Sequence, residues 1–93
     1  MQISWSLEAV NKVQSIRKYL LEEWSEDEVN SFLMKLMNFE KRVVRHPKLY
    51  PASLKYPSLR KAVISKHQSV IYGIDREIIR IYTILDHRQN KTL

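Results

Sequence analysis

Two stretches near the start of the chain repeat apolar residues at the spacing of a helix face. Before the first of them, Ser6 can serve as an N-cap, and charged residues occupy the side opposite the apolar one. The 3.6-residue period predicts an amphipathic helix of about five turns. The predicted inward positions of this helix are Leu7, Val10, Val13, Ile16, Leu20, Leu21 and Trp24.

The second apolar stretch begins at a capping box and ends at a proline. Ser25 can accept a hydrogen bond from the amide of Glu28, whose carboxylate can reach back. The helix is predicted to end at His46, because a residue before proline resists helical geometry. Since only the Trp24–Ser25 junction separates the two helices, they are predicted to form an antiparallel hairpin. The predicted inward positions of the second helix are Val29, Phe32, Leu33, Leu36, Met37, Phe39, Val43 and Val44.

Three later segments, residues 59–64, 69–74 and 77–86, are rich in β-branched and aromatic residues and predict a β-meander. Strand side chains alternate between faces, so one face is predicted to be apolar and the other to display arginine, lysine, tyrosine and histidine. Gly73, inside the second strand, indicates a bulge or a close backbone approach. In the last strand, alternation places Ile79, Ile81, Thr83 and Leu85 on one face and Ile78, Arg80, Tyr82, Ile84 and Asp86 on the other.

Together these elements predict an α+β fold in one domain spanning residues 1–93. Residues 2–5 are expected to form an N-terminal edge strand, and the antiparallel helical hairpin is expected to pack on the C-terminal antiparallel β-meander. Trp5 and Trp24 are interpreted as core residues. The other predicted core residues are Val13, Ile16, Leu20, Phe32, Leu36, Ile79 and Ile81.

The composition excludes several kinds of chemistry. The chain has no cysteine, which rules out disulfides, thiolate zinc sites and cysteine nucleophiles. Its three histidines show no ligand spacing such as i, i+4, so we expect neither a metal nor a cofactor. No apolar run approaches membrane-spanning length, and no apolar leader opens the chain. The expectation is therefore a cytoplasmic location without a membrane partner.

The net charge of +6 is distributed unevenly. Residues 1–40 contain four Lys/Arg and seven Asp/Glu, whereas residues 41–93 contain twelve Lys/Arg and three Asp/Glu. A basic meander joined to a mildly acidic helical half indicates a polyanion or an acidic protein as the partner of the sheet end.

The order of strand, helix, helix, proline-rich loop and three-stranded basic meander resembles the RelE/ParE superfamily of small bacterial toxins from type II toxin–antitoxin modules. The resemblance covers nearly the whole chain. It is carried by Ser4-Trp5-Ser6 followed by Ala9 and Ile16, the hairpin ending near Trp24, Leu59-Arg60-Lys61, the Ile-Tyr-Gly-Ile run at 71–74 and the closing run from Ile79 to Asn90.

The resemblance implies a toxin that a cognate antitoxin protein neutralises by wrapping around it, and it implies one of two toxic activities. RelE-like members cleave mRNA in the ribosomal A site. ParE-like members inhibit DNA gyrase and have no recognised nuclease site. The chain would therefore be an endoribonuclease if RelE-like and not an enzyme if ParE-like.

For a RelE-like activity, the resemblance implies that Arg60 and Arg80 bind phosphate and that His87 transfers a proton. Arginine suits phosphate because its planar fork binds two oxygens at once. Histidine suits either proton-transfer role because its pKa lies near neutrality. The other interpretation of the two arginines, that they pair with carboxylates or hold the antitoxin, stays open.

Four further residues are candidates for binding nucleic acid or another target. Lys61 and Lys66 can add positive charge near a phosphate, His67 is a second possible acid or base, and Tyr82 can stack on a base if it faces outward. Ordinary turn composition favours His67 as a turn residue before the third strand, and tyrosines such as Tyr82 are more often half-buried sheet residues than stacking platforms.

Departures from the nuclease pattern favour the ParE-like activity. The chain ending lacks a paired His-Tyr, and no glutamate lies in the loop or the first two meander strands as a base. For a gyrase inhibitor, toxicity is expected to depend on surface contacts at the C-terminal tail, including Arg88 and Lys91. An alternative of another class is a non-catalytic RNA-binding or protein-interaction module.

Overall fold

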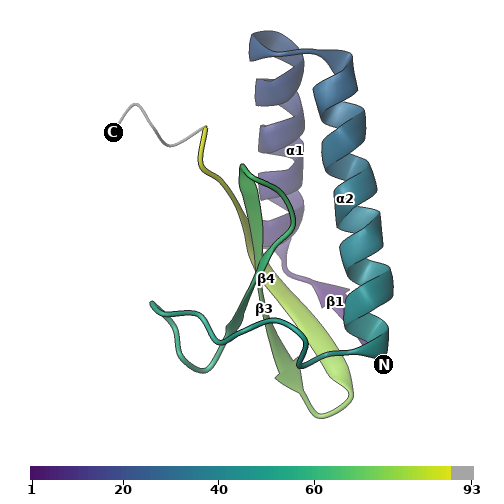
Figure 1. The fold of residues 1–93 in the computed structure, drawn as a ribbon, viewed down its shortest axis with the longest axis vertical. Helices are drawn as coiled ribbons and strands as arrows, with labels where there is room; N and C mark the ends of the chain where they lie inside the picture. The colour runs from purple at the N-terminus through teal and green to yellow at the C-terminus, as the bar shows by residue number, and fades with distance from the viewer. Residues whose placement is uncertain (89–93) are drawn as a thin grey trace.

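Two helices run side by side against a four-stranded sheet, as the computed structural model shows (Figure 1). The structure describes residues 1–88. The elements in chain order are β1 (Gln2–Trp5), α1 (Leu7–Glu23), α2 (Glu26–Arg45), β2 (Arg60–Val63), β3 (Gln68–Asp75) and β4 (Ile78–Asp86). Within the described residues, neither helix combines the length and the apolar composition that crossing a bilayer requires.

The sheet has the strand order β1-β4-β3-β2. β2, β3 and β4 form the predicted antiparallel meander, and β1 pairs with β4 in parallel, Ile3 lying opposite Ile79. The parallel edge strand makes the sheet mixed. The predicted α+β arrangement, with a helical hairpin on the meander, is confirmed.

Both helices begin at the predicted serine caps. The Ser6 hydroxyl accepts a hydrogen bond from the Ala9 amide at 2.9 Å, and the Ser25 hydroxyl accepts one from the Glu28 amide at 3.2 Å. The capping box predicts that the Glu28 carboxylate reaches back to Ser25. In the structure this carboxylate accepts a hydrogen bond from Arg88, just after β4. α2 ends at Arg45, one residue before His46 and two before Pro47.

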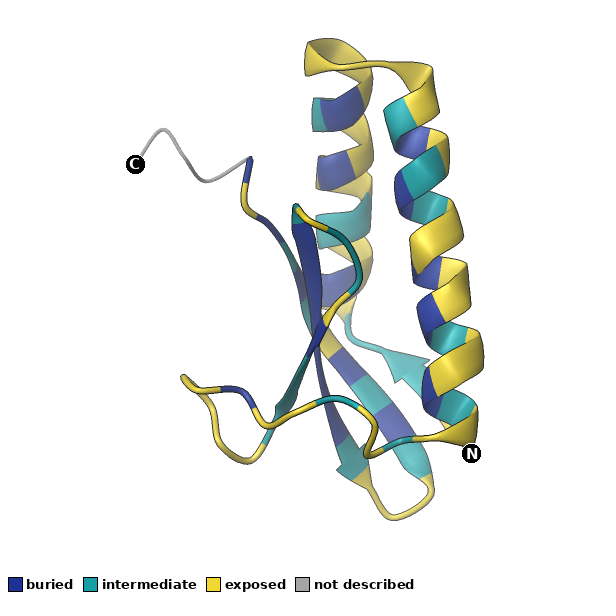
Figure 2. Cartoon of the chain, viewed as in Figure 1, coloured by how far each residue is buried: buried dark blue, intermediate teal, exposed yellow. Residues whose placement is uncertain are grey.

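The core lies between the helices and one sheet face, and burial follows a narrow stripe on each helix (Figure 2). The predicted core residues are buried except Val13, which is half-buried. Trp5 is half-buried, and Trp24 is 51% exposed, so its assignment to the core is wrong. Besides Trp24, the predicted inward positions that are exposed are Leu7, Val10, Leu21 and Met37.

The reason for these exposed positions is geometric. On α1 the fully buried residues are Ala9, Ile16 and Leu20, which recur at a spacing that marks one narrow stripe facing the sheet. Leu7, Val10 and Leu21 lie outside that stripe and are 76%, 42% and 59% exposed. The apolar positions of α1 therefore span more of its circumference than one sheet can bury.

A β-bulge in the middle of β4 reverses the predicted faces of its second half. Ile71 pairs with Thr83, yet the next residue, Tyr72, pairs with Ile81, so Tyr82 is an extra residue on β4. One extra residue moves every later side chain to the opposite face. Thr83 and Leu85 consequently lie on the outer face of the sheet, where they line a cleft with residues at the start of α1. Ile84 and Asp86 lie on the same face as Ile79 and Ile81, and both are buried.

Gly73 marks the close approach that the sequence indicates. A Cβ at this position would lie 3.0 Å from Leu59 Cδ2 and 3.2 Å from Tyr82 Cε2, both side-chain atoms. The glycine therefore makes room for the ring of the bulged tyrosine and for Leu59 on the outer face.

We expect Gly73→Ala to lower the free energy of unfolding by about 1 kcal/mol, the lower end of overpacking costs, because the end of the Leu59 side chain can move. Urea denaturation of the wild-type protein and the variant measures the change. A gain in stability would show that Leu59 and Tyr82 yield without cost.

Candidate functional site

Arg60 is a structural anchor for the segment that follows α2. Its Nη1 donates to the carbonyl of Tyr50 at 2.7 Å and to that of Lys48 at 3.3 Å. Opposite it in the sheet, the buried Tyr72 donates its hydroxyl to the Pro47 carbonyl at 2.6 Å, and burial raises the pKa of Tyr72. Both side chains thus fix the 47–50 segment against the core face of the sheet.

Arg80 lies on the outer face of the sheet. Alternation with the buried Ile79 and Ile81 points its side chain away from the helices, and its Nε lies 3.3 Å from the Asp75 carboxylate in a solvent-exposed ion pair. Arg60 shares the core face with the buried Ala62. The two predicted phosphate-binding arginines therefore project from opposite faces of the sheet.

His67 and His87 are neighbours at the end of the sheet where β3 begins and β4 ends. The amide of His87 donates to the carbonyl of His67 at 2.8 Å, and Lys66 is exposed in the same β2–β3 turn. Arg80 is seven residues before His87, which corresponds to roughly 20 Å along a strand. We call Lys66, His67 and His87 the tip of the sheet. The structure brings these three residues together and places Arg60 and Arg80 elsewhere.

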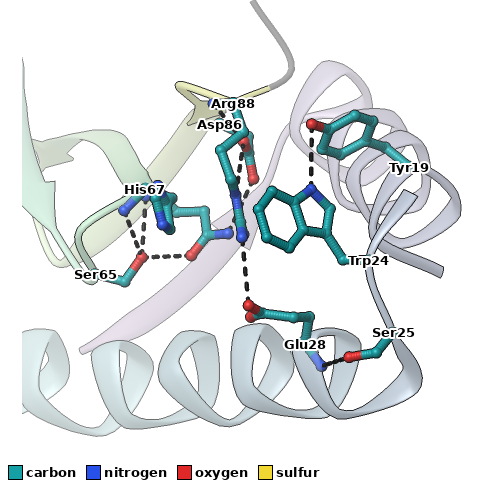
Figure 3. Close-up of polar contacts among 9 residues, drawn as sticks. Tyr19, Trp24, Ser25, Glu28, Ser65, His67, Asp86 and Arg88 are labelled. Atoms are coloured by element: carbon teal, nitrogen blue, oxygen red, sulfur yellow. Dashed lines mark hydrogen bonds and ion pairs between the residues drawn. The ribbon is translucent and has the colours of Figure 1, made fainter. Parts of the chain in front are cut away.

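Arg88, expected as an exposed target contact, is buried. Only 6% of its side chain is exposed, and its Nη1 lies 3.4 Å from Glu28 Oε1 and its Nε 3.8 Å from Asp86 Oδ1 (Figure 3). Its guanidinium lies over the Trp24 ring, 4.8 Å from the centroid. Arg88 thus joins the end of β4 to the turn between the helices, a role that the sequence analysis missed.

A chain of polar contacts continues from this clamp into the tip. The buried Asp86 carboxylate accepts from Gln68 Nε2 at 2.9 Å and from the Arg88 amide at 2.8 Å. Ser65 donates to Gln68 Oε1 and accepts from the amides of His67 and Gln68. Arg88, Asp86, Gln68 and Ser65 therefore hold the β2–β3 turn and the end of β4 in one arrangement (Figure 3). The signal available in the sequence was polar residues at alternate positions at the ends of two neighbouring strands.

The electrostatic surroundings of His67 favour its neutral form. Burial, followed by the positive charges of Arg88 and Lys66, lowers the pKa of His67, while Asp86 and Glu28 act in the opposite direction. A neutral imidazole at physiological pH can accept a proton.

This pKa direction predicts a pH dependence of stability. Because the folded pKa lies below the unfolded value of about 6.5, the unfolded state binds more protons as pH falls, and stability decreases from pH 7 toward pH 5. We expect a smaller decrease in His67→Gln, which has no titrating group there. Thermal unfolding at pH 7 and pH 5 provides the comparison, and equal decreases in both proteins would contradict the prediction.

The two remaining candidates, Lys61 and Tyr82, lie on the outer face of the sheet. Lys61 lines a cleft there, and Tyr82 is 42% exposed beside Gly73. Lys91 lies outside the described residues. No group of three His, Cys, Asp or Glu side chains within residues 1–88 is placed to hold a metal ion.

A family model described as the ParE toxin of the type II toxin–antitoxin system parDE matches residues 3–91. The chain belongs to this toxin family. The resemblance to the RelE/ParE superfamily is thereby confirmed, and the chain is the toxin component of a type II toxin–antitoxin system. None of the curated proteins matches the sequence significantly.

Solved structures with the same fold include both branches of the superfamily. The chain is 12% identical to a chromosomal ParDE protein from P. aeruginosa, covering 92% of this chain and 95% of that one with a TM-score of 0.78. It is 12% identical to a YoeB/ParE toxin from Agrobacterium tumefaciens, covering 94% and 99% with a TM-score of 0.64. It is 17% identical to a chain of the E. coli DinJ-YafQ toxin–antitoxin complex, covering 96% and 94% with a TM-score of 0.53. At these identities, the likeness to the solved structures shows a shared fold and nothing beyond it.

Proposed function

We propose that this toxin acts on DNA gyrase and does not cleave RNA. Membership of the ParE family supports the proposal. The main observation in its support is that Arg60, Arg80 and His87 lie on two faces and at two ends of the sheet.

Metal-free RNA cleavage requires a base, a positive charge at the phosphorane and an acid, all within reach of one phosphate. Nη1 of Arg60 donates hydrogen bonds to two carbonyl groups of the chain. Arg80 lies roughly 20 Å along the strand from His87. No single phosphate can contact all three side chains. The arrangement suits a binding surface better than a catalytic centre.

The tip is the surface that we assign to the target. Lys66 and His87 are exposed there, and Arg88 and Asp86 fix the backbone beneath them. Electrostatic complementarity with an acidic region of the target would guide association. Contacts of this kind are spread over several residues, so single substitutions are expected to act by degrees.

The test is inhibition of supercoiling by purified gyrase. We expect wild-type toxin to inhibit, Lys66→Glu to inhibit about tenfold less because a charge reversal at a contact opposes association, and the matched control Lys18→Glu on α1 to inhibit normally. His87→Ala should lose little. Full supercoiling activity in the presence of stoichiometric folded toxin would refute the proposal.

Ribosome-dependent mRNA cleavage is the second candidate function, and the adjacency of His67 and His87 favours it. A neutral His67 beside a second histidine provides a possible base and acid. For a nuclease, His87→Ala should abolish cleavage while leaving antitoxin binding intact. Programmed ribosomes incubated with the toxin, followed by mapping of mRNA ends, distinguish the two activities.

A further inference from the structure

The charges of α2 are separated along its length. Its first turn is acidic. From Lys35 to its end at Arg45, the helix carries four Lys/Arg side chains and one carboxylate, that of Glu40. After Glu40 the sequence contains no Asp or Glu before Asp75. The C-terminal end of α2 therefore has an excess of positive charge that nearby parts of the sequence do not balance.

The four cations and one asparagine lie on a single side of the helix. Successive members are separated by one to four residues, and residues three, four and seven apart share one side of a helix. The buried Leu36, Phe39 and Val43 face the core, so these five side chains point to solvent, and all five are exposed (Figure 2). We call them the α2 ridge: Lys35, Asn38, Lys41, Arg42 and Arg45.

The ridge has no carboxylate of the described chain as a partner. Glu40 is half-buried, and its Oε2 accepts a hydrogen bond from Trp5 Nε1 on β1 at 3.0 Å. Among residues 1–88, none of the ion pairs involves a cation of the ridge. All four positive charges are therefore available to a ligand.

A hollow lies on each flank of the ridge, and Arg42 lines both. One hollow, of about 690 Å³, is also lined by Lys41 and Arg45 and reaches Ile3 of β1. The other, of about 160 Å³, is also lined by Lys35 and Asn38 and reaches Val63 at the end of β2. The cations therefore border concave surfaces on both sides, into which the strands of a polyanion can fit.

The composition of the ridge distinguishes a nucleic acid from an acidic protein. A protein interface has an apolar or aromatic centre and a polar rim. Here the exposed apolar side chain beside the charged residues is that of Met34. Interfaces with DNA are more polar and much more positively charged than those between proteins. The ridge therefore favours the phosphate backbone of a nucleic acid.

The length of the ridge favours duplex DNA. Ten residues separate Lys35 from Arg45, which corresponds to about 15 Å along the helix axis. The major groove of B-DNA is about 12 Å wide, so the two ends of the ridge can reach phosphates on both sides of it. The major groove of duplex RNA is deep and narrow. Single strands are bound on aromatic platforms, and no residue of the ridge is aromatic.

We propose that the α2 ridge binds the phosphate backbone of duplex DNA without regard to base sequence. Lys35, Lys41, Arg42 and Arg45 each neutralise a phosphate. This surface lies on α2, apart from the tip, and its ligand is DNA itself. The inference therefore goes beyond the proposed function and is tested without gyrase.

The test is a titration of a labelled duplex DNA oligonucleotide with purified toxin at several salt concentrations. The expected Kd at physiological salt is about 10⁻⁴–10⁻⁶ M, as for non-specific binding. Four phosphate contacts should give a slope of log K against log salt of about −3.6, because each contact contributes about −0.9. Lys35→Gln and Lys41→Gln should each weaken binding and reduce the size of this slope by about 1.

Matched controls separate the ridge from the net charge of the protein. Lys18→Gln on α1 and Lys55→Gln in the segment before β2 remove the same charge from exposed positions elsewhere, so both should keep the wild-type slope. Arg42→Lys retains its charge and should also keep it. Because all of these residues are exposed, the melting temperatures of the variants should stay close to that of the wild type.

Equal losses of slope in the ridge variants and the two lysine controls would overturn the inference, because net charge alone would then explain binding. Tighter binding of single-stranded DNA or duplex RNA than of duplex DNA would also overturn it. Gyrase inhibition separates this inference from the proposed function. A toxin that binds DNA through the ridge but leaves supercoiling intact would refute the proposed function and support the ridge.

Discussion

Replacing Leu36 with alanine is expected to lower the free energy of unfolding by about 2–5 kcal/mol. Leu36 is 5% exposed and packs in the core between α2 and the sheet. Truncation removes buried methyl groups and leaves a cavity, and the helix cannot collapse into it, because Phe32 and Phe39 hold the same face one turn away on either side.

The matched control is Met37→Ala, one residue along the same helix. Met37 is 56% exposed, although helical spacing on the sequence places it inward. Its truncation should change stability by no more than about 0.5 kcal/mol. Chemical denaturation of both variants measures the two changes. A loss below 1 kcal/mol for Leu36→Ala, or equal losses in the two variants, would mean that the buried stripe of α2 is wrongly placed.

The arrangement of elements could be predicted because the chain contains strong periodic signals. Ile16, Leu20, Phe32 and Leu36 repeat at helical spacing, and all four are buried. The two serine caps sit where the periods start. Periodicity identifies which side of a helix is apolar, but it does not say how much of that side a neighbour covers. Leu7, at 76% exposure, shows the difference.

Gly73 indicated a bulge or a close approach, but the place of the bulge on β4 could not be predicted, because either register of the last strand is acceptable to its sequence. The run from Ile81 to Leu85 places apolar or β-branched residues on both faces whichever residue is skipped. The choice depends on β3, where Gly73 leaves space for the ring of Tyr82. Gly73 and Tyr82 belong to different strands, so the spacing of residues within the last strand does not indicate this contact. The outer cleft was missed for the same reason.

The positions of Arg60 and Arg88 depend on contacts between distant segments. Arg60 binds carbonyl groups 10 and 12 residues earlier in the chain, and Arg88 contacts Glu28, 60 residues earlier. From the sequence, both arginines resemble exposed residues of a basic strand. Trp24 resembles a core residue, whereas in the structure the side chain of Arg88 provides its cover.

Replacing Arg88 with alanine is expected to lower the free energy of unfolding by about 3 kcal/mol, the lower end of the cost of breaking a buried ion pair. The Asp86 side chain is fully buried, so loss of the nearby guanidinium leaves its charge in a poorly solvated place. The Glu28 side chain is 39% exposed and can recover water, which is why the lower end applies.

Two further measurements separate loss of this clamp from a general loss of packing. Arg88→Lys keeps the charge but lacks the planar group that lies over Trp24, so it should recover only part of the stability. The positive charge of Arg88 is one cause of the lowered pKa of His67, so Arg88→Ala should raise that pKa. Histidine NMR titration measures the shift under conditions where the variant is folded.

These outcomes also decide whether Arg88 contacts the target. If it acts only within the fold, gyrase inhibition by Arg88→Ala should fall in proportion to the folded fraction, and Arg88→Lys should inhibit nearly as well as wild type at a temperature where both are folded. A fully stable Arg88→Ala protein that no longer inhibits would instead require the side chain to leave Glu28 and Trp24 and reach the target directly. The buried position of Arg88 argues for the first result, because leaving it would strip Asp86 of its charged neighbour in the folded toxin.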